Sequence, residues 1–208
     1  MNAFTIRVLS YVGGLFIVSF GISLTIISGL GTGAWDALNV GLANMTTYTV
    51  GNWVIFIGIA LIFLNALLAK AKPELYSIVT IFVLGYFIDF WLLYIFSNTF
   101  FATFLLQLIV LCLGIVIIAF GASIYLQAKF ARIPVDGLML AIKDLLKVNF
   151  LIAKTITELL ALSIAFFVGG PIGLGTILVT VLIGPMIQWF YPRVEKKIQW
   201  EKVKNEHS

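Results

Sequence analysis

Four acidic residues lie within or beside long apolar stretches of the chain: Asp36, Asp89, Asp136 and Glu158. A carboxylate inside a membrane is costly and usually has a function there. Such a group can hold a proton, a cation or a polar substrate, so these four residues are the candidates for a substrate or ion path. For Asp36 and Asp136 the default is a structural role: each is expected in a first helical turn, where a carboxylate satisfies free backbone N–H groups.

The other two acids differ in their sequence neighbours. Glu158 lies one helical turn after Lys154, so this pair is expected to neutralise itself near the cytoplasmic face, which is a structural role. Asp89 has no such partner close in the sequence, and its role stays open.

Asp36 and Asp136 occupy equivalent points of an internal repeat. At an offset of 100 residues the segment 14–42 matches 114–142 at seven positions, which include Gly21 with Gly121 and Asp36 with Asp136. Between the later segments 76–90 and 176–190 the register slips to an offset of 99, which places Asp89 opposite Gln188. The chain therefore contains a duplicated unit.

The composition predicts a polytopic membrane protein, because 62% of the residues are hydrophobic and 11% are charged. Apolar runs of about 20 residues suffice to cross a bilayer as helices. Six such spans are predicted, at 8–28, 52–69, 75–96, 101–126, 150–168 and 172–191. Shorter helices are expected at 35–45 and 134–146, too short to span, and each is either re-entrant or interfacial.

The positive charges predict the orientation of the chain. With the N-terminus in the cytoplasm, all 13 Lys and Arg residues fall on the cytoplasmic side, and connectors 29–51, 97–100 and 169–171 contain none. We expect both termini in the cytoplasm. Because each repeat has three spans, the second copy is expected to be inverted in the membrane, with units at 1–98 and 99–191 followed by a basic cytoplasmic tail at 192–208.

Glycine and proline mark the breaks between these spans. Their predicted roles are helix breaking and close helix packing, at Gly29, Gly31, Gly33, Pro134, Gly170, Pro171, Gly173 and Gly175. The glycine-rich segments do not have the strand context or the Gly-Lys-Ser/Thr sequence of a phosphate-binding loop. No metal site, cofactor, catalytic set or nucleic-acid interface is predicted, and the one histidine, His207, lies in the tail.

Several motifs in order resemble a known family. The segments GLGTGAWDALNVGL (29–42), GYFIDFW (85–91), IPVD (133–136), AKTITE (153–158) and GPIGLGT (170–176) are similar to those of the bacterial YczE/YitT-type membrane proteins, on the YczE branch. The resemblance covers nearly the whole chain. It implies a small protein of the bacterial plasma membrane without an established cofactor, and it supplies no substrate or catalytic residues.

Two classes of function fit these features. Inverted repeats, interrupted segments and buried acids are typical of a secondary transporter or permease. The alternative is a non-catalytic membrane scaffold or regulatory partner, in which the acids only cap helices. We expect no enzyme. The bilayer is the expected partner, a small molecule or ion is the expected substrate, and the sequence is also compatible with an oligomer.

Overall fold

The computed structural model describes residues 3–206 of the chain and the side chains of 4–196. This part is all-helical and contains no strand, as predicted. Its helices are α1 (Ala3–Ile27), α2 (Ala34–Met45), α3 (Val50–Ala69), α4 (Ser77–Asp89), the π-helix η1 (Phe90–Ile95), α5 (Phe104–Gln127), α6 (Pro134–Leu146), α7 (Phe150–Phe167) and α8 (Leu174–Glu206).

Six helices are long and apolar enough to cross a membrane, which confirms the predicted number. They are α1, α3, α4 continued by η1, α5, α7 and α8. Two boundaries differ from the prediction, because α1 begins at Ala3 and α8 continues through Pro192 to Glu206. The boundary predicted before residue 192 thus falls inside α8, and the end of the predicted tail, 207–208, lies outside the described residues.

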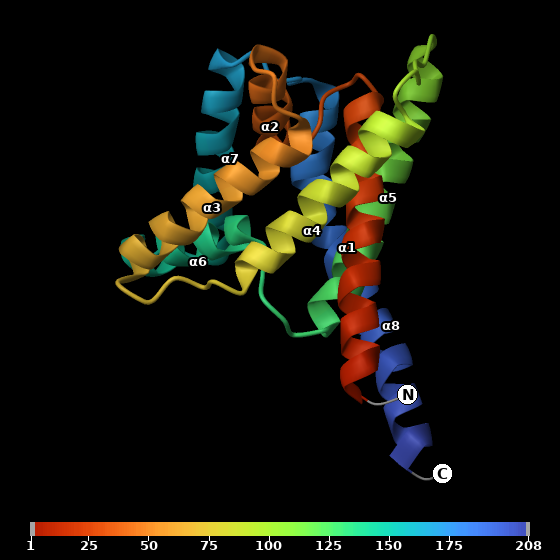
Figure 1. Cartoon of the computed structure of the whole chain (residues 1–208), viewed down its shortest axis with the longest axis vertical. Coiled ribbons are helices and arrows are strands. Elements are labelled where there is room, and N and C mark those ends of the chain that lie inside the picture. The colour runs from red at the N-terminus through yellow and green to blue at the C-terminus, as the bar shows by residue number, and fades with distance from the viewer. Residues whose placement is uncertain (1–2, 207–208) are drawn as a thin grey trace.

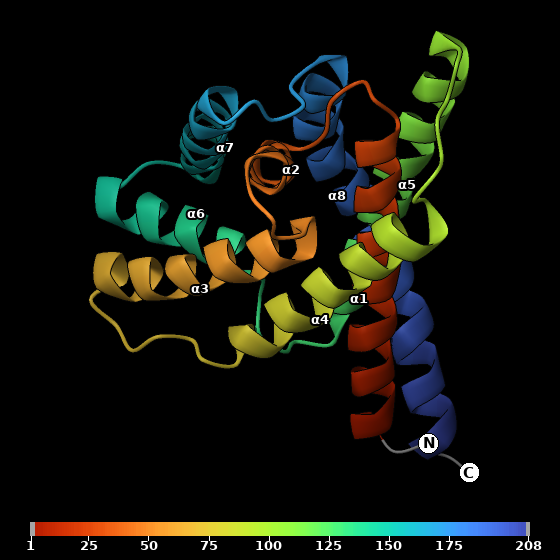
Figure 2. The ribbon, with the colours of Figure 1, turned by 45° about the horizontal axis from the view of Figure 1, so that its top comes forward.

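The long helices alternate in direction, and both termini lie at the same end of the molecule (Figure 1). The short helices α2 and α6 have 12 and 13 residues. Each of them packs against both α3 and α7, so they are covered by longer helices (Figure 2). Their first turns contain Asp36 and Asp136, as predicted, and Pro134 occupies the first turn of α6.

The centre of the fold is the long contact between α1 and α5. Glycines at equivalent repeat positions bring the two backbones together. A Cβ added to Gly21 would lie 2.8 Å from the carbonyl oxygen of Gly114, and one added to Gly114 would lie 2.9 Å from that of Gly21. Small residues are the usual means of such close approach between membrane helices.

The glycine-rich connector that follows α1 meets the one that precedes α8. Gly29 and Gly31 have φ values of 73° and 98°, which L side chains rarely adopt, so the helix break here depends on glycine. The amide of Gly175 donates to the carbonyl of Leu30 at 2.7 Å, and a Cβ on Gly173 would lie 2.5 Å from that same oxygen. Gly29 and Gly31 thus lie at a break between helices, and Gly173 and Gly175 lie in close backbone contact with Leu30.

Candidate functional site

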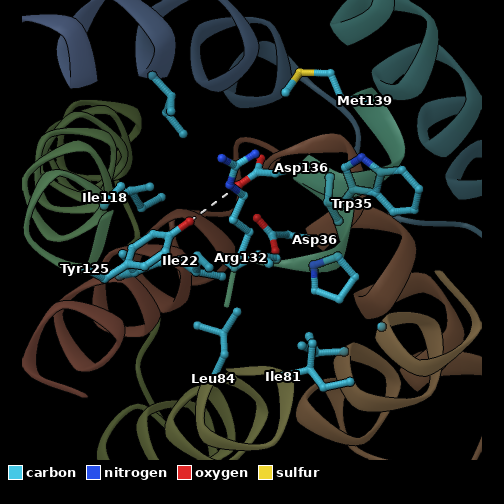
Figure 3. A pocket seen from close by; sticks show the side chains of 18 of the residues that line it. Ile22, Trp35, Asp36, Ile81, Leu84, Ile118, Tyr125, Arg132, Asp136 and Met139 are labelled. Atoms are coloured by element: carbon cyan, nitrogen blue, oxygen red, sulfur yellow. Dashed lines mark hydrogen bonds between the residues drawn. The ribbon is translucent and has the colours of Figure 1, made fainter. Parts of the chain in front are cut away.

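A cavity of about 530 Å³ lies at the centre of the molecule, and all eight α-helices contribute to its wall. Its surface is mainly apolar, formed by side chains such as Ile81, Leu84 and Ile118. Both Asp36 and Asp136 line it (Figure 3). The first turns of α2 and α6 therefore bring one acid from each repeat to a single space.

Asp36 has little compensation for its charge. Gly33, the residue before α2, makes no side-chain cap, and the Asp36 carboxylate accepts no hydrogen bond within the described part of the chain. Asp36 lies outside the six candidate spans. Burial, and secondarily the negative charge of Glu158, raises the pKa of Asp36 to about 7.

Asp136, unlike Asp36, has a hydrogen-bond donor and positive charges close to its carboxylate. The Tyr125 hydroxyl donates to its Oδ2 at 3.4 Å. Burial raises the pKa of Asp136, while this hydrogen bond and the positive charges of Lys154 and Arg132 act in the opposite direction. Tyr125, Arg132 and Lys154 all line the same cavity, and the close view shows the Tyr125 hydroxyl directed toward Asp136, with Arg132 beside it (Figure 3).

Two polar atoms on α2, Nε1 of Trp35 and Oδ1 of Asn39, are buried and have no hydrogen-bond partner among the described residues. Both residues line the cavity, and Asn39 is only 6% exposed. An orphaned buried polar atom is destabilising, so it is often found where a ligand or water completes the hydrogen bond. The repeat-equivalent positions hold Val135 and Met139, which have no such groups.

Asp89 does not join this site. It is absent from the cavity wall, and its carboxylate accepts hydrogen bonds from the Thr49 hydroxyl at 2.6 Å and from the Gly51 amide at 2.8 Å. Asp89 thus caps the beginning of α3 from the end of α4. The hypothesis that Asp89 belongs to the path receives no support from this geometry.

This cap leads to a prediction for Asp89. Replacing Asp89 by Ala leaves the Thr49 hydroxyl and the Gly51 amide without their acceptor, which we expect to cost about 1–3 kcal/mol of stability. Asp89→Asn keeps one carbonyl acceptor and is expected to cost less. Thermal melting of the purified variants measures both effects. Loss of transport or ligand binding in an Asp89→Asn variant that keeps wild-type stability would instead support a role for Asp89 in a substrate or ion path.

The expected pair of Lys154 and Glu158 is not formed. Within the described side chains, the ion pair shorter than 4.0 Å is that of Lys143 with Asp144. Lys154 lines the cavity instead, whereas Glu158 is not in its wall and acts on Asp36 through its charge. Helical spacing allows the pair because both residues lie on one face of α7, but the Lys154 side chain lines the cavity and makes no contact with Glu158 within 4.0 Å.

The sequence reasoning missed several residues of this wall. Tyr125 was not considered, and Arg132 and Lys154 were used only for topology and pairing. Trp35 and Asn39, which differ from the equivalent residues of the second repeat, are not among the residues predicted from the sequence. That difference was an available signal, because an asparagine and a tryptophan replace apolar residues beside an acid common to both copies.

The six long apolar helices define a multi-pass membrane protein. The chain belongs to a family of unknown function (DUF6198), which matches residues 5–192. The resemblance drawn from the motifs is confirmed at this level.

The relatives are bacterial. The chain is 43% identical to the uncharacterized protein YyaS of Bacillus subtilis, over 88% of this chain and 91% of the relative. It is 35% identical to the uncharacterized membrane protein YczE of the same organism, over 88% of this chain and 84% of the relative. An uncharacterized protein of Haemophilus influenzae is 29% identical, over 89% and 83% of the two chains. No solved structure matches the chain.

Proposed function

We propose that this protein is a secondary transporter or permease for a small solute in the bacterial plasma membrane, with both termini in the cytoplasm. It is non-catalytic in this proposal, and its partners are the bilayer and the solute. The observation that supports it most is the central cavity, lined by Asp36 and Asp136 from equivalent repeat positions. A substrate site between repeats, formed at the ends of short helices, is typical of such transporters.

The packing of the short helices supports an inverted repeat. Under the offset of about 100, α1, α2, α3 and α4 correspond to α5, α6, α7 and α8. The observed contacts come in matching pairs: α2 packs on α7 as α6 packs on α3, α2 on α3 as α6 on α7, and α1 on α4 as α5 on α8. Two halves exchanged by such a symmetry can rock against each other about a fixed central site.

The contact between α3 and α4 has no comparable counterpart between the corresponding helices α7 and α8 in the described residues. Helix α3 packs closely on α4, where a Cβ on Gly58 would lie 2.7 Å from Ile81. At the seam between α7 and α8, the Nζ of Lys154 lies 3.8 Å from the point that a Cβ on Gly184 would occupy. This weakly packed seam lies within the second repeat, where Lys154 of α7 approaches Gly184 of α8.

Solute uptake tests the proposal. Solutes that raise the melting temperature of the purified protein identify candidates, since a ligand of the folded state stabilises it. In proteoliposomes with an imposed pH gradient, we expect at least one of them to accumulate above protein-free liposomes. The double variant Asp36→Asn, Asp136→Asn is expected to remain folded and to return uptake to background. Accumulation of none of the stabilising solutes, or full uptake by the double variant, would favour a scaffold.

A further inference from the structure

We propose that the α2 end of the cavity binds the ammonium group of a small organic amine whose apolar body occupies the rest of the space. This proposal rests on the proposed function, because the amine would be the transported solute. It is carried by two residues of α2, Asp36 and Asn39, and by their contrast with the equivalent residues of α6.

The charge at this end of the cavity has no counterion. Among the described residues the Asp36 carboxylate has no hydrogen bond or ion pair, and the charge that acts on it, that of Glu158, is also negative. Asp136, by contrast, has the Tyr125 hydroxyl at 3.4 Å and the charges of Arg132 and Lys154. A cation entering the cavity is therefore attracted to Asp36 more than to Asp136.

Asn39 adds an acceptor for the same group. It follows Asp36 by three residues on α2, which puts the two side chains on one face of the helix. Its Oδ1 is buried and has no partner, and the residue lines the cavity. A carboxylate and an amide oxygen together match a group with several N–H donors and a positive charge, which is an ammonium ion.

The rest of the wall selects an organic ion over a metal ion. Calcium requires about six to eight oxygen ligands, and magnesium retains several waters. The wall of the cavity is instead formed largely by apolar side chains such as Ile57, Leu61 and Ile81. A cavity of about 530 Å³ also falls within the range of sites for small organic molecules. An amine with an aromatic or branched body satisfies both the polar end and the apolar wall.

Calorimetry on the purified full-length protein at pH 8 tests this site, with phenethylammonium as the probe. We expect it to bind, and we expect the neutral 2-phenylethanol and the anionic 3-phenylpropanoate to bind at least about tenfold more weakly, since they lack the positive charge. Absence of binding of the amine to the folded wild-type protein, or equal binding of the alcohol, would overturn the proposal.

Variants locate the ammonium group. Asp36→Asn should weaken amine binding by at least about 30-fold, because it removes the charge partner. Asn39→Met, which installs the residue found at the equivalent position 139, should weaken it by about threefold to tenfold. Asp136→Asn should have a smaller effect than Asp36→Asn, and the exposed Asp144→Asn should have none. Equal losses for Asp36→Asn and Asp136→Asn would overturn the assignment to α2, and Asn39→Met provides the test if Asp36→Asn fails to fold.

Failure of this inference is distinct from failure of the proposed function. If the amine does not bind while another solute accumulates in proteoliposomes, the ammonium site is wrong and the transporter stands. If the amine binds at Asp36 but no solute is transported, the site stands and the transporter is wrong.

Discussion

Replacement of Gly14 by Val should abolish the folded protein or lower its melting temperature sharply, whereas the same change at the adjacent Gly13 should not. A Cβ on Gly14 would lie 2.5 Å from the backbone nitrogen of Tyr125 and 2.7 Å from its Cβ, while a Cβ on Gly13 has nothing within 4 Å. A backbone nitrogen cannot rotate aside, so α1 and α5 must separate.

The expected cost at Gly14 is at the upper end of the about 1–3 kcal/mol typical of overpacking, or above it. Gly13→Val is the matched control and should stay within about 1 kcal/mol of wild type. Because Tyr125 also lines the cavity and donates to Asp136, the Gly14 variant should lose ligand binding together with stability. Equal melting temperatures for the two variants would contradict the close α1–α5 contact.

Asp36→Asn should stabilise the protein at pH 8 and flatten the dependence of stability on pH. Burial and the charge of Glu158 raise the folded-state pKa of Asp36 to about 7, above its ordinary value of 3.8. The folded state then binds the proton more tightly than the unfolded state. The stabilisation of the folded state by protonation of Asp36 is fully present below about pH 4, decreases as the pH rises, and is lost above about pH 7.

The size of this effect follows from the shift in pKa. Three pKa units correspond to at most about 4 kcal/mol, spread over the interval from about pH 4 to pH 7. The other charged groups that line the cavity are Asp136, Arg132 and Lys154. Asp136→Asn is the matched control, because Asp136 lines the same cavity but has positively charged neighbours. Melting temperatures of wild type and both variants at pH 5 and pH 8 measure the difference.

The outcome also separates the two interpretations of Asp36. A helix cap is stabilising when ionised, so its removal would lower stability by about 1 kcal/mol at pH 8. By contrast, an ionised acid that lines an apolar cavity destabilises the folded protein when no ligand is bound there. A lower melting temperature for Asp36→Asn at pH 8 would therefore support the cap and contradict the path.

The features that sequence predicted well are those set by neighbouring residues. Runs of apolar residues determine the spans, and Gly29 and Gly31 interrupt the chain where positive φ values are required. Pro134 begins α6 because proline fits a first helical turn. The position of Asp36 and Asp136 in first turns follows from the same local rules.

The features that sequence could not provide depend on contacts between distant segments. Asp89 appeared isolated because its partner Thr49 lies 40 residues away in the chain. The pairing of Lys154 with Glu158 is compatible with helical spacing, but spacing does not determine how the Lys154 side chain is directed, and in the structure it lines the cavity. The unpartnered atoms of Trp35 and Asn39 are a property of burial, which no local pattern reports.

Access to the cavity from both sides of the membrane is the central requirement of the transporter proposal. Single cysteines replacing Leu84 or Ile118, both on the cavity wall, report this access in a Cys112→Ser background. Exposed loop positions provide the sidedness controls: under the proposed orientation Asn98→Cys reacts with impermeant reagents from outside, and Ala71→Cys only from inside. Outside labelling at position 71 would contradict that orientation.

The most direct measurement is therefore the labelling of these two cavity cysteines by a small impermeant thiol reagent in right-side-out and in inside-out vesicles. A transporter that alternates between two open states predicts labelling of each cysteine in both vesicle preparations, blocked from both sides by a solute that binds in the cavity. Labelling of both cysteines from one side only, or from neither, in folded and inserted protein would contradict alternating access at this site.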